Sequence, residues 1–315
     1  MVAVVAWSPL TRGEGWFPVH NHNPLVLTQV APGSPADPSV AAGVWLARVH
    51  YSLSNTLNQE SSAREALVFD GETEVLAVAV TRGLAGGGAL WFQVPLIRHA
   101  GGGLDRLIDR YHDWLGLPAG KRPGWPRDRL RFEYERDGVT EVRLNDPTGG
   151  LGDVTLGISS GWRAGGSERG ALYASMKLPS GNANRLTGSG GAAFGVGADL
   201  EWSLAERWRG RLQAGVTWLA PGDLLPQLQR RWAGAMGVGI GWRATPALDL
   251  RTQVDASTAL YRDSRLRWLN EAVLLTAGAG IRLDPQWTLE LAVTEDLLVD
   301  AAPDVTFQVG LSRRF

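Results

Sequence analysis

The chain ends in a segment in which every second residue is apolar. In residues 304–315 the side chains between the apolar ones are polar or absent, and the last residue is aromatic. Successive side chains of a β-strand point to opposite faces, so this pattern predicts a strand with one apolar and one polar face. The apolar members are Phe307, Val309, Leu311 and Phe315, together with Val305.

The same alternation recurs along most of the chain and predicts an all-β fold. Counting the terminal segment, we expect 12 strands, an even number. The expected strands lie near residues 44–54, 72–82, 89–98, 152–162, 172–178, 194–204, 208–218, 232–242, 248–260, 273–283, 287–293 and 304–315. The last strand should pair with residues 287–297 on one side and with residues 44–54 on the other, which would close a barrel.

Short and long connections alternate between these strands. Short links are expected near residues 84–88, 164–170, 205–207, 244–246 and 284–286. Longer links are expected near residues 55–65, 99–150, 179–189, 221–230, 262–270 and 298–303. Short turns at one end and long loops at the other are typical of transmembrane antiparallel up-and-down β-barrels, whose long loops are extracellular.

The distribution of tryptophan supports a barrel in a membrane over a soluble sheet protein. The chain has 14 Trp, and many of them fall near the predicted strand ends. Trp162, Trp202, Trp208, Trp242 and Trp287 are near the short turns, while Trp218, Trp232 and Trp268 are toward the long loops. Such aromatic belts mark the two membrane interfaces. No run of about 18 apolar residues occurs, so membrane-spanning helices are not expected.

Charged residues occupy the parity opposite to the apolar one. In a membrane barrel this parity faces the lumen. The predicted lumen-lining residues are Asp199, Glu201, Arg209, Arg211, Asp249, Arg251, Asp255, Arg282, Glu290 and Asp296. They can select a permeating molecule, or they can only pair with one another across neighbouring strands, and the narrow lumen of a 12-stranded barrel favours pairing.

A break in the alternation predicts an extracellular insertion at residues 99–150. Leu104, Leu107, Ile108, Tyr111 and Trp114 recur at helical spacing, which predicts a short amphipathic helix. This helix could constrict the pore, or it could pack on a hairpin predicted at residues 129–144 around Asp137-Gly138.

The N-terminal residues 1–42 lack any periodic pattern and contain scattered Pro and Gly. We expect an irregular segment that could fill the lumen of a barrel formed by residues 43–315. The apolar residues 1–6 are too short for a secretory signal, which suggests a truncated signal or a late start codon. The alternative is an N-terminal extension of a cytoplasmic protein.

Other functional classes find little support in the sequence. The chain has no Cys, and its formal net charge of −1 argues against nucleic acid as the main partner. The five His residues show no metal-binding spacing, and the glycine-rich segments 150–153 and 188–191 lack the context of a phosphate loop. We expect no cofactor, no metal and no catalytic residues. His99 and His112 would be the raw material for an outer-membrane lipid hydrolase, but no nucleophile motif accompanies them.

Several landmarks resemble a family of uncharacterised proteobacterial outer-membrane proteins, domain of unknown function 3187. They are Asn21-His22-Asn23-Pro24-Leu25, Tyr111-His112-Asp113, Gly150-Leu151-Gly152-Asp153, Leu178-Pro179-Ser180-Gly181, Thr187-Gly188-Ser189-Gly190, Gly222-Asp223-Leu224-Leu225-Pro226 and Arg313-Arg314-Phe315. Two of them, Gly-Leu-Gly-Asp and Leu-Pro-Ser-Gly, are also similar to outer-membrane channels of the phenol meta-pathway type, which are thought to pass small, rather apolar molecules. The resemblance implies a fold and a location but no substrate.

We therefore expect a monomeric channel in the outer membrane of a Gram-negative bacterium, passing a small molecule by passive diffusion. The alternative is a plugged barrel with a structural or interaction role. Expected partners are outer-membrane lipid and lipopolysaccharide, the permeating molecule and the outer-membrane assembly machinery. Phe307, Val309, Leu311 and Phe315 are the predicted assembly signal.

Overall fold

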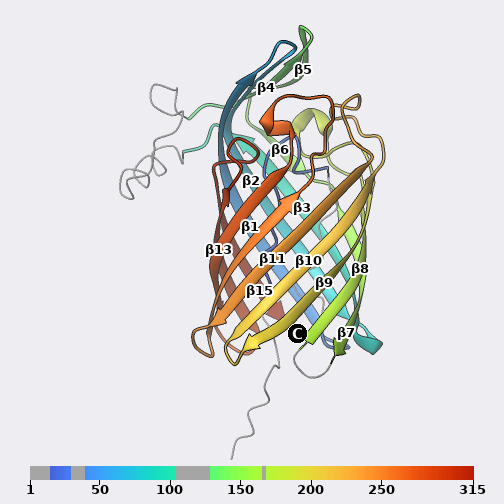
Figure 1. The fold of residues 1–315 in the computed structure, drawn as a ribbon, viewed down its shortest axis with the longest axis vertical. Coiled ribbons are helices and arrows are strands. Elements are labelled where there is room, and N and C mark those ends of the chain that lie inside the picture. The colour runs from blue at the N-terminus through green and yellow to red at the C-terminus, as the bar shows by residue number, and fades with distance from the viewer. Residues whose placement is uncertain (1–14, 30–39, 104–127, 165–167) are drawn as a thin grey trace, which may run out of the picture.

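A computed structural model of the chain contains a closed antiparallel barrel of 12 strands (Figure 1). The structure describes residues 15–29, 40–103, 128–164 and 168–315. The barrel strands are β1 (Trp45–Ser61), β2 (Glu65–Gly83), β3 (Gly88–Ala100), β7 (Thr155–Ala164), β8 (Glu168–Lys177), β9 (Ala193–Ala205), β10 (Trp208–Leu219), β11 (Trp232–Arg243), β12 (Leu248–Ser257), β13 (Ala272–Arg282), β14 (Trp287–Asp296) and β15 (Val305–Arg314).

Each barrel strand pairs with its sequence neighbours, and two further pairings close the ring. β15 pairs with β14 and, in the register Leu46↔Arg314 to Asn55↔Val305, with β1. β3 pairs with β2 on one side and with β7 on the other. The predicted strand number and the closure by the terminal strand are confirmed. Short and long links alternate as predicted except between β1 and β2, where only residues 62–64 connect the strands.

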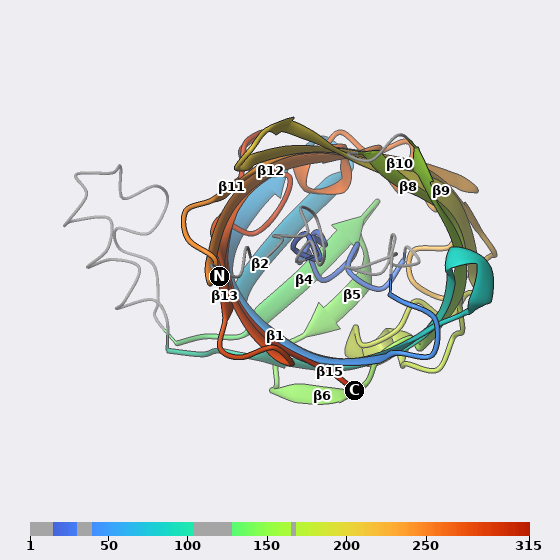
Figure 2. The ribbon, with the colours of Figure 1, turned by 90° about the horizontal axis from the view of Figure 1, so that it is seen from below.

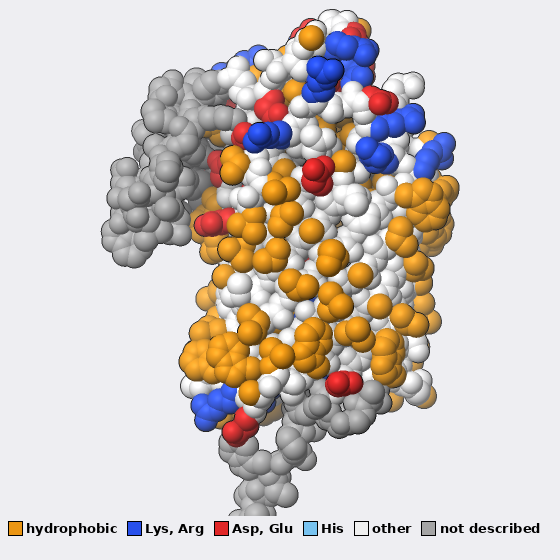
Figure 3. Space-filling view, in the orientation of Figure 1, with side chains coloured by type: hydrophobic (Ala, Val, Ile, Leu, Met, Phe, Trp, Pro, Cys, Tyr) orange, Lys and Arg blue, Asp and Glu red, His pale blue; other side chains and the backbone are white. Residues whose placement is uncertain are grey.

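The apolar side chains of the alternating pattern lie on the outer surface of the barrel. Figure 3 shows apolar side chains over the barrel wall, with charged side chains gathered toward the two ends. Exposed apolar residues recur at every second position, as in Phe194, Val196 and Leu200 of β9 and Met236, Val238 and Ile240 of β11. Exposure of so many large apolar side chains would be unfavourable in water, whereas it suits contact with lipid. The structure is therefore that of a transmembrane β-barrel.

Aromatic side chains flank the apolar surface. Trp208 and Trp242 stack with ring centroids 5.9 Å apart beside the short turns, and Phe194 contacts Trp218 at 5.8 Å near the long loops. Trp268 was expected in the second belt, but it is only 1% exposed. It lies in the 3-10 turn η3 (Arg267–Leu269), which folds inward and packs on Phe69.

Strands β1 and β2 extend beyond the barrel at the end with the long loops. The prediction of a loop at residues 55–64 is wrong, because β1 runs to Ser61 and pairs with β2 along its whole length. These residues are polar because this part of β1 lies beyond the apolar band of the barrel. Its side chains bond neighbouring loops, and Glu60 accepts hydrogen bonds from the backbone N–H groups of Arg267 and Trp268.

Three further strands lie at this end. β4 (Arg131–Arg136) pairs with β2 and with β5 (Val139–Leu144), and β6 (Thr148–Leu151) pairs with β3. The predicted hairpin around Asp137 and Gly138 is confirmed, since both residues adopt the positive φ that a tight hairpin turn requires. The remaining 3-10 turns are η1 (Ala85–Gly87) and η2 (Ala183–Arg185).

An apolar core closes this extracellular end. Phe69 of β2 stacks on Phe132 of β4, and further members come from β4, β5, the extracellular ends of barrel strands and the loops that follow β8, β10 and β12. It includes Leu25, Leu186, Leu225, Tyr261 and Trp268. The predicted amphipathic helix with Leu104, Leu107, Ile108, Tyr111 and Trp114 lies outside the described residues. Among the described helices, none has the length and hydropathy to cross a membrane.

Candidate functional site

Residues 15–29 run through the interior of the barrel (Figure 2). Near the short-turn end, Trp16 Nε1 donates a 2.8 Å hydrogen bond to Glu201 Oε2 on β9. The backbone N–H of Phe17 donates to Gln253 Oε1 on β12 at 3.2 Å, and Gln253 Nε2 donates back to the carbonyl of Phe17 at 3.3 Å. Arg251 donates to the carbonyl of Gly15. This end of the segment is therefore fixed to two strands of the wall.

The other end of the segment is fixed to the extracellular loops. Asn23 Nδ2 donates to the carbonyl of Trp268 at 2.6 Å. Gln29 Nε2 donates to Tyr261 Oη at 3.0 Å, and that hydroxyl donates to the carbonyl of Leu25 at 2.5 Å. The segment, which we call the inner segment, thus spans the lumen with both of its ends anchored.

One part of the inner wall is a continuous series of ion pairs, which we call the charged wall. The pairs are Arg169–Glu201 at 2.6 Å, Arg209–Glu201 at 3.5 Å, Arg209–Asp249, Arg251–Asp249 at 3.0 Å, Arg251–Glu290 at 3.0 Å and Arg48–Glu290 at 3.7 Å, with Arg211–Asp199 at 2.5 Å beside them. They lie on β8, β9, β10, β12, β14 and β1. Opposite charges alternate along the series, so each desolvated charge is balanced by a neighbour.

Glycines on the intervening strands let these long side chains meet. Gly241 of β11 pairs in register with Arg209 of β10 and with Arg251 of β12. A Cβ on Gly241 would lie 2.8 Å from Arg209 Nε, and one on Gly310 of β15 would lie 3.2 Å from Glu290 Oε2. The prediction from sequence used the charges and missed these glycines. The available signal was their position on the polar parity, where a side chain would otherwise block the lumen.

Aromatic side chains of the inner segment cover the charged wall. The guanidinium carbon of Arg209 lies 5.1 Å from the ring centroid of Trp16, and that of Arg251 lies 4.5 Å from the ring of Phe17. A Cβ on Gly239 would lie 2.4 Å from Trp16 Cζ3, so the Trp16 ring lies directly against the β11 backbone. Cation–π contacts of this kind are stronger when the groups are desolvated. The inner segment therefore shields the ion pairs.

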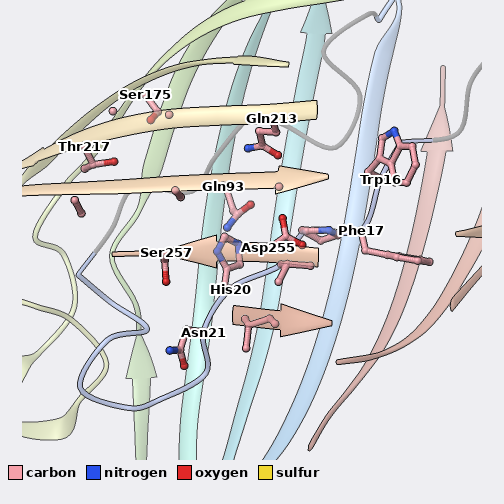
Figure 4. A pocket seen from close by; sticks show the side chains of 18 of the residues that line it. Trp16, Phe17, His20, Asn21, Gln93, Ser175, Gln213, Thr217, Asp255 and Ser257 are labelled. Carbon is pink, nitrogen blue, oxygen red and sulfur yellow. The ribbon is translucent and has the colours of Figure 1, made fainter. Parts of the chain in front are cut away.

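A cavity of about 240 Å³ remains between the inner segment and the opposite part of the barrel. Figure 4 shows Gln93, Ser175 and Gln213 around it on the barrel strands, with Phe17, His20 and Asn21 on the inner segment. Arg48, Arg211 and Asp255 border parts of this cavity. We call the part of its lining on β2, β3, β8 and β10 that carries small or uncharged side chains the neutral wall. These side chains are Ala77, Ala79 and Thr81 on β2, Trp91 and Gln93 on β3, Tyr173 and Ser175 on β8, and Gln213 and Thr217 on β10.

Glycines also shape the neutral wall. A Cβ on Gly157 would lie 2.4 Å from Cε2 of Trp91, and a Cβ on Gly197 would lie 2.3 Å from the hydroxyl of Tyr173. Both aromatic rings therefore lie close to the wall beside the cavity. The cavity lining combines aromatic and aliphatic side chains with polar ones such as Gln93, Ser175 and Gln213. Apolar walls with placed polar groups are usual for a small-molecule site.

The predicted lumen residues fall into three groups. Asp199, Glu201, Arg209, Arg211, Asp249, Arg251 and Glu290 belong to the charged wall, and Asp255 lines the cavity. Arg282 lies at the short-turn rim, where it donates to the carbonyl of Pro246 at 3.0 Å. Asp296 lies at the extracellular rim and accepts hydrogen bonds from backbone N–H groups of residues 298, 301 and 302.

The predicted assembly-signal residues lie on the outer parity of β15. Val309, Leu311 and Phe315 are exposed, and Phe307 is partly exposed. Arg313 stacks its guanidinium carbon 4.5 Å from the Phe315 ring centroid. The opposite parity of this strand, Thr306, Gln308 and Ser312, is buried toward the lumen.

The histidine considered for hydrolysis has a structural environment. His99 Nδ1 is 3.0 Å from Thr73 Oγ1, and its Nε2 is 3.1 Å from the carbonyl of Leu186. Both ring nitrogens are therefore occupied, and the ring packs edge-on against Phe132. His112 lies outside the described residues. Within the described part of the chain, no cluster of His, Asp or Glu could hold a metal ion.

The glycine-rich motifs come together in one hydrogen-bonded cluster at the extracellular ends of β7, β8 and β9. Lys177 Nζ donates to Asp153 Oδ2 at 2.5 Å and to Ser189 Oγ at 2.6 Å. Asp153 also accepts from the backbone N–H groups of Gly181 and Ser189. A Cβ on Gly188 would lie 2.7 Å from Asp153 Oδ1. These glycines thus allow two loops to close around a buried ion pair.

Solved structures with similarity to this chain include an outer-membrane channel and two porins. A channel from Pseudomonas putida F1 is similar over 90% of this chain and 99% of its own, with a TM-score of 0.63 and 14% identity. The NanC porin covers 85% of this chain and 98% of its own at a TM-score of 0.48 and 9% identity. The KdgM porin is similar over 85% of this chain and 99% of its own, with a TM-score of 0.45 and 9% identity. Only the first likeness is close enough to indicate a shared fold.

No curated protein matches the chain at a significant level. The model of one protein family, described as "Protein of unknown function (DUF3187)", matches residues 1–315. The match covers the barrel strands, the inner segment and the clustered glycine motifs alike. The chain therefore belongs to the DUF3187 family.

Proposed function

We propose that the protein is a channel through which a small, uncharged and largely apolar molecule diffuses passively across the outer membrane. The observation that carries this proposal is the cavity of about 240 Å³ inside the barrel, between the inner segment and the neutral wall. An apolar cavity of ~150 Å³ accommodates benzene in another protein, and drug-sized ligands occupy ~300–1,000 Å³. The cavity therefore suits a molecule somewhat larger than benzene.

The distribution of charge supports an uncharged permeant. Arg251 is 1% exposed and pairs with both Asp249 and Glu290, while Trp16 and Phe17 cover this part of the wall. Charges that are paired and covered offer little attraction to an ion in the remaining space. A charged solute would lose its hydration beside alanine, glycine and aromatic side chains, which is costly. The Pseudomonas putida F1 protein of similar fold is itself an outer membrane channel.

Swelling of liposomes that contain the purified barrel tests this proposal. Uncharged solutes of increasing size should enter at rates that fall with size, and carboxylates of the same size should enter more slowly. Empty liposomes provide the baseline, and heat-modified migration on a gel shows that the barrel is folded. Folded barrel that gives only the baseline rate for every solute would contradict the channel.

A second candidate is a plugged barrel with a structural role. It is favoured by the inner segment, which is anchored to β9 and β12 at one end and to Trp268 and Tyr261 at the other. The apolar core over the extracellular mouth points the same way. On this alternative, deletion of residues 15–29 creates solute flux that the intact chain lacks. On the channel proposal, the intact chain already conducts, and deletion only increases the size limit.

A further inference from the structure

Two polar side chains of the neutral wall are buried without a hydrogen-bond partner. Trp91 and Ser175 are each 6% exposed, and neither Trp91 Nε1 nor Ser175 Oγ has a partner among the described residues. Both line the cavity. A buried donor that makes no hydrogen bond is unfavourable, so such groups in native structures usually have a role or a missing partner.

The register brings these two groups together. Gly157 of β7 pairs with Trp91 of β3 on one side and with Ser175 of β8 on the other. The Trp91 ring lies over Gly157, because a Cβ there would be 2.4 Å from Cε2, the carbon that carries Nε1. The indole N–H and the serine hydroxyl therefore flank the same glycine on the cavity side of the wall.

The surroundings of this pair define what it could bind. Tyr173 lies two residues before Ser175 on β8, and Thr81 of β2 pairs in register with Trp91. Ala79 pairs with Gln93, the next cavity-lining residue of β3. The Tyr173 hydroxyl already accepts a hydrogen bond from Gln213 Nε2 at 3.4 Å. Three charged side chains also border the cavity. Arg211 is paired with Asp199 and Arg48 with Glu290, while Asp255 adds a carboxyl group. The site thus offers the indole N–H and the serine hydroxyl beside both apolar and uncharged polar side chains, the latter including Thr81 and Gln93.

We propose that Trp91 and Ser175 form a binding site for an uncharged molecule that carries an acceptor oxygen on a flat or short apolar body. A ketone or ester carbonyl accepts from the indole N–H and from the serine hydroxyl, while the apolar body lies against Tyr173 and Ala79. A carboxylate is disfavoured because it would lose hydration there, and the two described arginines that border the cavity, Arg48 and Arg211, are already paired with Glu290 and Asp199. This inference rests on the proposed function, since the ligand is the permeating molecule.

The test uses the ¹⁵N-labelled indole resonances of the full chain in detergent micelles. The Trp91 resonance is the one that disappears in Trp91→Phe. Acetophenone is the probe, and α-methylstyrene, which has a methylene group in place of the carbonyl oxygen, is its matched control. Acetophenone should shift the Trp91 resonance downfield and saturably, whereas α-methylstyrene should not. Equal responses to the two probes, or no response to either, would overturn the site.

Serine variants provide the second arm. Ser175→Ala should weaken acetophenone binding ~2–10-fold, which corresponds to the loss of one hydrogen bond. Ser159→Ala is the matched control, because Ser159 is also buried without a partner but does not line the cavity. Its affinity should equal that of the wild type. Equal affinities in Ser175→Ala and Ser159→Ala would remove Ser175 from the site.

The outcomes for this site and for the channel are separable. Selective binding of acetophenone by a barrel that gives no flux in liposomes would contradict the channel and leave the binding site intact. Flux of uncharged solutes without a selective shift of the Trp91 resonance would leave the channel intact and overturn the site.

Discussion

The charged wall and the neutral wall of the lumen use glycine for opposite purposes. Beside the charged wall, Gly241 and Gly310 make room for long side chains that reach across a strand and pair, as in Arg209–Asp249 and Arg48–Glu290. On the neutral wall, Gly157 and Gly197 let aromatic rings lie against the barrel beside the cavity. The first arrangement fills and stabilises the lumen, and the second keeps part of it open. The comparison teaches that polarity alone does not identify the path of a permeating molecule.

The largest effect is expected from breaking the charged wall at its centre. Arg251→Ala would leave Asp249 and Glu290 without this cation, and Gly15 without its donor. Removing one partner of a buried ion pair typically costs about 3–5 kcal/mol, so the free energy of unfolding should fall by this amount. Denaturant unfolding in lipid vesicles measures it. Arg282→Ala at the rim is the control and should cost less than about 1 kcal/mol. Equal losses would refute a stabilising charged wall.

A smaller effect is expected where the inner segment meets this wall. In Gly239→Ala the new methyl group would lie 2.4 Å from Trp16 Cζ3, so the ring must move away. Overpacking of this kind costs about 1–3 kcal/mol, and displacement of the segment should raise solute flux severalfold. Gly234→Ala is the control, since its methyl group would approach other atoms no closer than 3.6 Å. Unchanged flux in Gly239→Ala would show that Trp16 does not limit the path.

Filling the neutral wall should affect transport more than stability. Ala79→Leu places additional side-chain volume in the cavity and should lower the flux of uncharged solutes severalfold. The free energy of unfolding should change by less than about 1.5 kcal/mol if the cavity accepts the added atoms. Ala47→Leu adds the same atoms to the outer parity of β1 and serves as the control. If the two variants conduct alike, the cavity is not on the path.

The smallest effect concerns pH and the ionic contacts outside the membrane. Burial acts to raise the pKa of Glu65. Hydrogen bonds from the Arg265 N–H and the Tyr134 hydroxyl, together with the charge of Arg136, outweigh burial, so the pKa is lowered. A carboxyl with a lowered pKa stabilises the fold above its unfolded-state pKa and loses this effect as pH falls through its folded-state pKa. Hydrogen exchange in the β4–β5 hairpin should therefore increase in acid, while ligand binding at the neutral wall stays constant.

Glu65→Gln is the control for the pH effect. The amide cannot titrate, so exchange in the hairpin should lose most of its dependence on acid pH. A hairpin that opens in acid to the same extent in both proteins would assign the effect to other carboxyl groups, such as Asp137, whose pKa is lowered by its contact with Arg64.

Much of the fold follows from the sequence, because a single alternating parity sets both the lipid face and the lumen face. The closure of β15 on β1, the hairpin at Asp137 and the burial of Gln308 are examples. Residues 55–64 were misread because polarity in a strand beyond the membrane resembles polarity in a loop. The position of Trp268 was predicted wrongly because a loop lacks the alternating pattern that assigns strand residues to one face. Only tertiary packing brings its ring against Phe69.

The site was less accessible from sequence, because it depends on which residues face one another across strands. The charges of β9, β10, β12 and β14 could be assigned to the lumen side by parity. The existence of a separate neutral wall could not be predicted, because it depends on the strand register that places Trp91, Gly157 and Ser175 in one row. The path of residues 15–29 along β9 and β12 likewise has no sequence pattern, since it follows from individual hydrogen bonds such as that between Trp16 and Glu201.

Blocking the cavity from a single position tests the central claim most directly. The chain has no Cys, so Ser175→Cys introduces the only thiol, and the wild type controls for non-specific effects of the reagent. Flux of a small uncharged solute into liposomes is measured before and after reaction with N-ethylmaleimide. The account predicts that flux through Ser175→Cys falls to the level of empty liposomes while wild-type flux is unchanged. Full labelling of the thiol with no loss of flux would contradict a path along the neutral wall.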